Sequence, residues 1–165
     1  MQTLAQLDHD HAALDATINH FDTLLQRPRQ AHTTDVHTML KVLIRQLSDH
    51  LQFEESTLYL PLHASGHARS DVVTRLLAEH ADLRETLRQL ARFCSHPRLL
   101  HDEMFLLYSA HLIDLYREHS DREHRWLLPV LEQLPPVSSR QEVEVVKPYR
   151  SRWNGEHSAL VSIDS

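Results

Sequence analysis

The sequence contains almost no glycine, with only Gly66 and Gly155 in a chain of 165 residues. Because tight turns between strands usually need glycine, this scarcity disfavours a sheet and predicts a mostly helical protein. Cys94 is the only cysteine, which excludes an internal disulfide and is typical of a reducing compartment. The length suits one domain with a sizeable core.

Two further absences limit the partners that we expect. The formal net charge is −6 and no run of five basic residues occurs, which argues against a nucleic-acid partner. No apolar run approaches the ~18 residues that a membrane-spanning helix needs, so we expect no membrane partner. The N-terminal residues lack the basic and hydrophobic regions of a secretion signal, and we therefore expect a cytoplasmic protein.

Histidine, by contrast, is abundant. The chain has fifteen histidines, which is several times the ordinary usage of this residue. Because histidine is the commonest metal ligand, the excess favours a metal site, although many of the fifteen side chains could simply be solvated.

Apolar residues recur every three or four positions in four long segments, at about residues 3–26, 34–63, 70–94 and 100–134. The links between them are short, so neighbouring segments should be antiparallel. The pattern predicts an all-α, up-down-up-down four-helix bundle. Pro61 and Pro129 lie near the C-terminal ends of the second and fourth segments, where we expect tolerable kinks.

The last part of the chain has a different pattern. Pro135 and Pro136 end the fourth segment, and the residues after them read as extended or irregular chain. We therefore assign residues 1–134 to the bundle and residues 135–165 to a C-terminal extension. That extension could pack on the bundle, stay mobile, form a homodimer with a second subunit or bind a redox partner.

The two halves of the bundle repeat at a spacing of 69 residues. Six polar positions match under this shift: His11 with His80, His50 with His119, and Glu54 with Glu123. The two histidines of each half are 39 residues apart. An acidic residue, an alanine and a leucine around the first histidine of each half also repeat. A match of this extent predicts two related helical hairpins in tandem.

The six repeat residues should lie at one level of the bundle and point inward. His11 and His50 are each about 15 residues from the first link, so both should be ~23 Å from that end. In each half the second histidine and the glutamate are four residues apart, which places them on one helix face. Leucines surround that face, so we expect the six side chains inside the bundle.

Buried carboxylates at this level need a positive partner. Each would cost several kcal/mol in an apolar interior unless it were neutralised. Metal cations provide that neutralisation, and mixed imidazole and carboxylate ligands suit iron, manganese or zinc. Four histidines and two glutamates are too many for one tetrahedral zinc. They suit two metals bridged by the glutamates, and the repeat assigns His11 and His50 to one metal and His80 and His119 to the other.

Four motifs resemble the hemerythrin-like family, also called HHE cation-binding domains. They are DHAAL at 10–14, HLQFEESTLYLP at 50–61, EHADL at 79–83 and HSDREHRWLLP at 119–129. The resemblance covers roughly residues 4–134. It implies a carboxylate-bridged, non-heme centre of two iron ions, with an oxo or hydroxo bridge and with manganese as the alternative metal. The small ligand that it implies is O2, NO or peroxide.

Two departures from the oxygen-carrying members of the family concern the ligands. Those members have a fifth histidine one turn from that of the third helix, where this chain has Leu76, and an aspartate where it has Glu123. The resemblance then implies open positions on both irons, which favours a reactive or sensing centre over simple O2 carriage. Tyr116, one turn before His119, is the candidate for an additional cofactor-binding residue. It could be a ligand, a hydrogen-bond donor to bound oxygen, or a core aromatic.

The function that we expect is a di-iron protein that binds or senses O2 or NO. One alternative is an enzyme, either a di-iron oxidoreductase acting on peroxide or NO or an iron–sulfur-cluster repair protein. Two others are a metal store of the ferritin type and a metal-free interaction bundle. The ferritin type is disfavoured because its Glu-x-x-His pairs are missing from this sequence.

Overall fold

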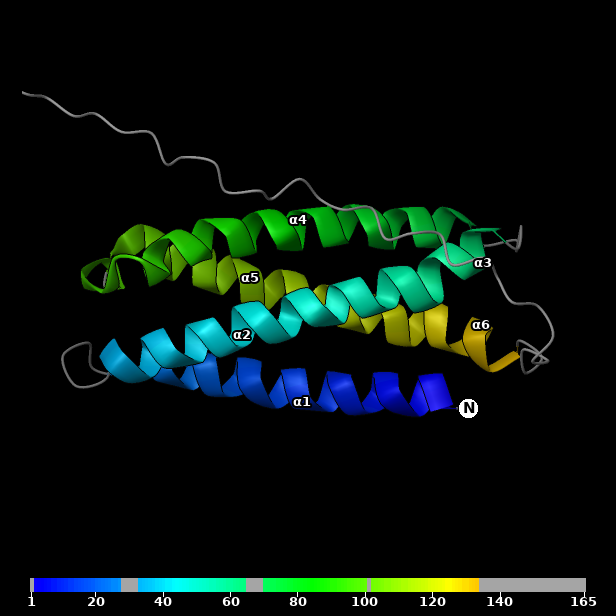
Figure 1. Cartoon of the computed structure of the whole chain (residues 1–165), viewed down its shortest axis with the longest axis horizontal. Coiled ribbons are helices and arrows are strands. Elements are labelled where there is room, and N and C mark those ends of the chain that lie inside the picture. Colours follow the sequence, from blue (N-terminus) through cyan, green and yellow to red (C-terminus); the bar gives the residue numbers. More distant parts are fainter. Residues whose placement is uncertain (1, 28–32, 65–69, 101, 134–165) are drawn as a thin grey trace, which may run out of the picture. The chain divides into compact units, whose positions relative to one another are not determined.

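The computed structural model of the protein describes residues 2–27, 33–64, 70–100 and 102–133, and this part of the chain forms helices without strands. Four long rods run antiparallel (Figure 1). The elements in chain order are α1 (Gln2–Leu25), α2 (Thr33–Glu54), η1 (Glu55–Tyr59), α3 (Leu60–Ala64), α4 (Ser70–Cys94), η2 (Pro97–Leu99), α5 (Glu103–Arg122), η3 (Glu123–Leu127) and α6 (Leu128–Gln133). The predicted all-α four-helix bundle is confirmed.

The four rods close into a ring. Helix α1 packs against α2 and α5, and α4 packs against the same two helices from the other side. The second rod consists of α2, η1 and α3, and the fourth consists of α5, η3 and α6, so both hairpins have the same construction (Figure 1). The predicted boundary at residue 134 stays a prediction, because residues 134–165 lie outside the described part of the chain.

The fourth rod begins later than the sequence pattern indicates. A short 3₁₀ turn, η2, follows the third link, and α5 starts at Glu103 rather than near residue 100. The Asp102 side chain caps this start, because its carboxylate accepts a hydrogen bond of 2.8 Å from the backbone N–H of Met104.

The expected kinks take the form of π-helical turns. In η1 and η3 the residue just before a proline donates its backbone N–H to the carbonyl five residues earlier. A proline has no N–H for the carbonyl four residues back and crowds that carbonyl, and the wider turn relieves this conflict. Pro61 and Pro129 are 68 residues apart, and so are the starts of η1 and η3. The π turns therefore follow the prolines and not the 69-residue repeat.

The core has two apolar clusters with a polar layer between them. Each rod passes from one cluster through the polar layer into the other. In α1, for example, Leu7 belongs to the smaller cluster, His11 to the polar layer and Leu14 to the larger cluster. The smaller cluster comprises Leu7, Leu58, Tyr59, Leu62, Val73, Leu76 and Leu127. The larger one fills the rest of the bundle, and its members that border the polar layer include Leu14, Leu51, Leu83 and Tyr116. The two clusters hold the polar layer in a fixed place.

Candidate metal centre

The six repeat residues make up most of the polar layer. Each is at most 4 % exposed, although all are polar or charged. They form two groups whose potential ligand atoms lie within 4.8 Å of one another: His11, His50, Glu54 and Glu123, and Glu54, His80 and His119. The structure thus brings together all six residues that the repeat singles out, and it separates the histidines into the same pairs.

Glu54 lies between the two groups. Its Oε1 atom is 3.3 Å from His11 Nε2 and 3.0 Å from His50 Nε2. Its Oε2 atom is 3.3 Å from His80 Nε2 and 3.8 Å from His119 Nε2. One carboxylate therefore faces all four imidazoles, which is the position that a bridging ligand needs.

Glu123 approaches the same imidazoles from the fourth rod. Its Oε2 atom is 3.1 Å from His11 Nε2 and 3.6 Å from His119 Nε2. Its other oxygen, Oε1, accepts a hydrogen bond from the Tyr59 hydroxyl. The second carboxylate therefore also contacts one histidine of each pair.

Tyr59 belongs to the centre, although the sequence analysis did not find it. Its hydroxyl contacts Glu123 and lies 3.3 Å from His80 Nε2. Burial and the negative charges of Glu123 and Glu54 raise the pKa of this hydroxyl, so it stays protonated and acts as a donor. In a regular α-helix Tyr59 would be rotated ~140° from Glu54, whereas the π turn η1 brings it to the same side. The sequence feature that could have predicted this is Pro61, because a proline at this point favours the π turn.

Tyr116, the predicted additional cofactor-binding residue, points elsewhere. It is buried, and its hydroxyl donates a 3.1 Å hydrogen bond to Asp15 Oδ1. Burial and the Asp15 charge raise the pKa of this hydroxyl. Its role toward a cofactor stays a prediction, and the structure offers Tyr59 as the tyrosine in contact with the six residues.

Charge is balanced inside the layer by protons on imidazole. Burial alone would lower the pKa of His11, but hydrogen bonds and charges from Glu123 and Glu54 raise it to about 10. Burial likewise lowers the pKa of His119, and Glu54 and Glu79 outweigh it and raise the pKa to about 9. Burial raises the pKa of Glu54, yet its histidine neighbours hold that pKa well below the usual range. A metal ion would have to displace these protons.

The donor set fits a pair of metal ions. Five atoms of these residues are buried without a hydrogen-bond partner among the described residues: His11 Nδ1, His50 Nδ1, His50 Nε2, Glu54 Oε2 and Glu123 Oε2. Buried polar atoms normally have a partner, and each such exception calls for an explanation. Imidazole nitrogens and carboxylate oxygens that converge on one interior point are the ligands preferred by iron, manganese and zinc.

Two carboxylates outside the six residues orient the second pair of histidines. Glu55 Oε1 lies 2.9 Å from His80 Nδ1 and also contacts the Arg84 guanidinium. Burial raises the pKa of Glu55, but His80 and Arg84 outweigh it and lower the pKa to about 2. The carboxylate is therefore ionised and fixes the ring of His80, as carboxylates behind metal-binding histidines commonly do.

Glu79 has the same relation to His119. Its Oε2 atom is 3.2 Å from His119 Nδ1, and its Oε1 atom is 2.7 Å from Arg122 Nη1. Burial raises the pKa of Glu79, while His119 and Arg122 lower it by more. The sequence indicates neither contact, because each joins two different rods and depends on their packing.

Comparison with known proteins gives one match. The family model described as hemerythrin HHE cation binding domain matches residues 2–131. None of the curated proteins matches the chain, and none of the solved structures does. Among the described residues, no helix is both long enough and apolar enough to cross a membrane.

Proposed function

The chain belongs to the hemerythrin HHE cation-binding family, and on this premise we propose that it is a non-heme di-iron protein that binds or senses O2 or NO. The observation that carries the proposal is Glu54, which is fully buried with its two oxygens facing four imidazoles. The proposed ligands are His11, His50, Glu54, His80, His119 and Glu123. Manganese is the alternative metal.

Each residue has a distinct task in this proposal. His11 and His50 would hold one ion and His80 and His119 the other, and the two glutamates would supply carboxylate oxygens to both. When bound, the metal pair supplies a redox-active centre that coordinates a small diatomic ligand. The apolar clusters on both sides of the layer exclude water. Tyr59, which is fully buried, provides a hydrogen-bond donor inside the layer.

A second candidate is an oxidoreductase that turns over peroxide or NO, and Tyr59 is the observation that favours it. Such turnover needs a proton inside the bundle, and the raised pKa of the Tyr59 hydroxyl keeps a proton beside Glu123. Kinetics with each oxidant separate the two functions. A sensor forms a stable adduct with a single equivalent of ligand, whereas an enzyme consumes many equivalents.

The metal content tests the proposal directly. We expect the protein from cells grown with ample iron to contain two iron ions per chain, one for each group, and to be coloured by ligand-to-metal charge transfer. Elemental analysis and optical spectra under argon, O2 and NO measure this. The proposal fails if the purified protein contains no transition metal.

Replacing Tyr59 by phenylalanine should leave the iron content unchanged and weaken the bound ligand. In this proposal the Tyr59 hydroxyl donates a buried hydrogen bond to the bound ligand, and such a bond is worth about 1.5 kcal/mol. Without it, the NO adduct should dissociate about tenfold faster. Stopped-flow spectroscopy measures the rate. Tyr116→Phe is the matched control, because that hydroxyl contacts Asp15. If only Tyr116→Phe changes the rate, Tyr116 and not Tyr59 interacts with the ligand.

A further inference from the structure

The two histidine pairs differ in what holds their outer nitrogens. In the second pair, the Nδ1 atoms of His80 and His119 contact Glu55 and Glu79, and each carboxylate contacts an arginine. In the first pair, the Nδ1 atoms of His11 and His50 are buried and have no hydrogen-bond partner among the described residues. Only the second pair is therefore held through its outer nitrogens as well before a metal arrives.

Four repeat positions in the sequence explain this difference. Under the 69-residue shift, the members of the two carboxylate–arginine pairs correspond to these residues: Asp10 for Glu79, Phe53 for Arg122, His124 for Glu55 and Asp15 for Arg84. Asp10 is shorter than Glu79 and accepts a hydrogen bond from Gln6 instead. Nδ1 of His124 contacts the backbone carbonyl of Ser120. Among the described residues, the first pair of histidines therefore has no counterpart of the carboxylates that contact the Nδ1 atoms of His80 and His119.

The first pair also adjoins an acidic pocket. A cavity of about 440 Å³ lies between α1 and α2, and Asp10, Asp49 and His50 are among its lining residues. No lysine or arginine lines it. Asp49 lies 3.9 Å from Arg45, and because both side chains are largely exposed, this pair neutralises little charge. His50, only 4 % exposed and with its Nδ1 atom buried without a hydrogen-bond partner among the described residues, also lines this pocket.

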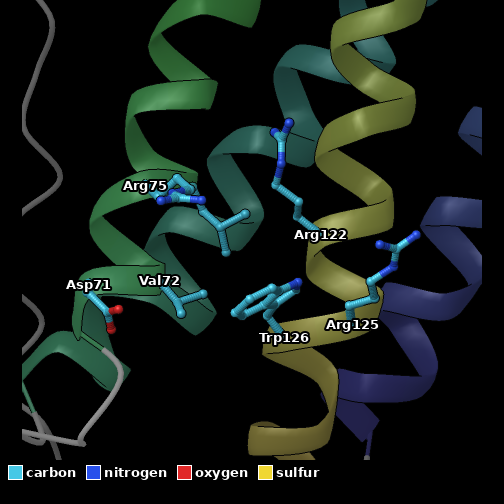
Figure 2. Close-up of a pocket in the computed structure, with 7 residues that line it drawn as sticks. Asp71, Val72, Arg75, Arg122, Arg125 and Trp126 are labelled. Atoms are coloured by element: carbon cyan, nitrogen blue, oxygen red, sulfur yellow. The ribbon is translucent and has the colours of Figure 1, made fainter.

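The opposite hairpin has a pocket whose charged lining side chains are mainly basic. A cavity of about 310 Å³ between α4 and the fourth rod is lined by Arg75, Arg122 and Arg125, with Asp71 as its only acidic residue. Figure 2 shows these side chains around Trp126. Arg122 is the residue that holds Glu79 behind His119. Arg122 and Arg125 are also paired with Glu118 and Asp121. The pocket lined by His50, with two carboxylates and no arginine or lysine, is therefore the one of the two that attracts a cation.

From these observations we infer that the two metal positions are inequivalent. The His80 and His119 position is the tight one, and the His11 and His50 position is exchangeable and is loaded with divalent cations through the pocket of Asp10 and Asp49. This inference rests on the proposed function, because it concerns the same two ions. It assigns Glu55 and Glu79 as positioning residues for one ion and Asp10 and Asp49 as entry residues for the other.

Metal release separates the two positions. The protein is loaded anaerobically with two equivalents of Fe(II) and mixed with an excess of a chromogenic iron chelator. We expect two phases of equal amplitude whose rates differ by about tenfold or more, since losing the contacts behind a metal-binding histidine typically costs 10–100-fold in affinity. The fast phase belongs to the His11 and His50 position.

Variants assign the slow phase. Glu79→Gln removes the charge behind His119 and should accelerate the slow phase about tenfold while the fast phase keeps its rate. Glu118→Gln is the matched control, because Glu118 also contacts Arg122 while the carboxylate at His119 Nδ1 is that of Glu79. If Glu79→Gln does not fold, Glu55→Gln makes the same test on His80.

The acidic pocket is tested by the rate of loading. In the double variant Asp10→Asn and Asp49→Asn, the second equivalent of Fe(II) should bind several-fold more slowly at low salt, and less so at high salt. Asp82→Asn, an exposed carboxylate on α4, is the control and should load at the normal rate.

The outcomes distinguish failure of the inferred inequivalence from failure of the proposed function. Release in a single phase, or equal acceleration of both phases by Glu79→Gln, overturns the inequivalence while leaving the di-iron proposal intact. Normal loading of the double aspartate variant overturns the entry route. Failure of the unaltered protein to bind any iron overturns the proposed function itself.

Discussion

Glu54→Ala should purify without iron. The two oxygens of Glu54 lie within 3.8 Å of the Nε2 atoms of all four histidines, and Glu54 belongs to both groups of potential ligands. Removing it deletes the bridge and leaves each ion with too few anionic ligands for a stable site. No other single substitution should have so large an effect on metal content.

The same variant should lose stability, for two reasons. Ligands that bind only the folded state stabilise it by mass action, and this contribution disappears with the metal. Breaking a buried, paired charge also costs about 3–5 kcal/mol, because the partners that remain are uncompensated. Elemental analysis and thermal unfolding of unaltered protein and variant measure both effects.

A surface carboxylate provides the comparison. Glu85→Ala on α4 alters an exposed residue that pairs with Arg88 and Gln89 on its own helix, and it should keep the normal iron content and unfolding temperature. Retention of two iron ions by Glu54→Ala would show that Glu54 is not a bridging ligand.

Proton release should accompany metal binding and make the metal affinity strongly dependent on pH. The raised pKa values of His11, about 10, and His119, about 9, mean that both imidazoles carry protons at neutral pH when no metal is bound. A metal ion needs neutral imidazole, so it must displace these protons. Metal affinity should therefore increase steeply as the pH rises from 6 toward 9, and iron should be released as the pH falls.

The metal-free protein should show the opposite trend at alkaline pH. The pKa of His11 is higher in the folded chain than its ordinary 6.5, so its stabilisation is complete below 6.5 and is lost as the pH rises through about 10. The pKa of Glu55 is lowered from 4.5 to about 2, so its stabilisation is complete above 4.5 and is lost as the pH falls through about 2. Together they place the stability maximum of the metal-free protein between about pH 4.5 and 6.5.

Thermal unfolding of both forms from pH 2 to pH 10 checks these trends. The difference in unfolding temperature between loaded and metal-free protein should grow with pH, and a pH-indicator dye should record the protons released on loading. Retention of iron in strong acid would argue against a site made of histidines and carboxylates.

The sequence predicts the bundle and the six central residues for one physical reason. Both depend on helical periodicity, which fixes the face on which a residue lies once the helix is recognised. The 69-residue repeat then relates the two hairpins, so that Glu54 and Glu123 could be placed opposite one another before any packing was known. Positions determined by register are readable from a sequence.

Other features depend on departures from that register or on packing between rods. Tyr59 enters the centre because η1 is a π turn, and α-helical periodicity places it on another face. Glu55 and Glu79 reach histidines on neighbouring rods, at distances that no pattern within one helix specifies. The role of residues 135–165 and the choice between iron and manganese depend on chemistry that periodicity does not encode.

The polar layer also has a consequence for folding cooperativity. It separates two apolar clusters that each span several rods, and the six repeat residues at that level are all polar or charged. Two such clusters can melt as separate units when little energy couples them. Bound metal ions would tie residues from all four rods together between the clusters, and they would convert two loosely coupled units into one that unfolds in a single transition.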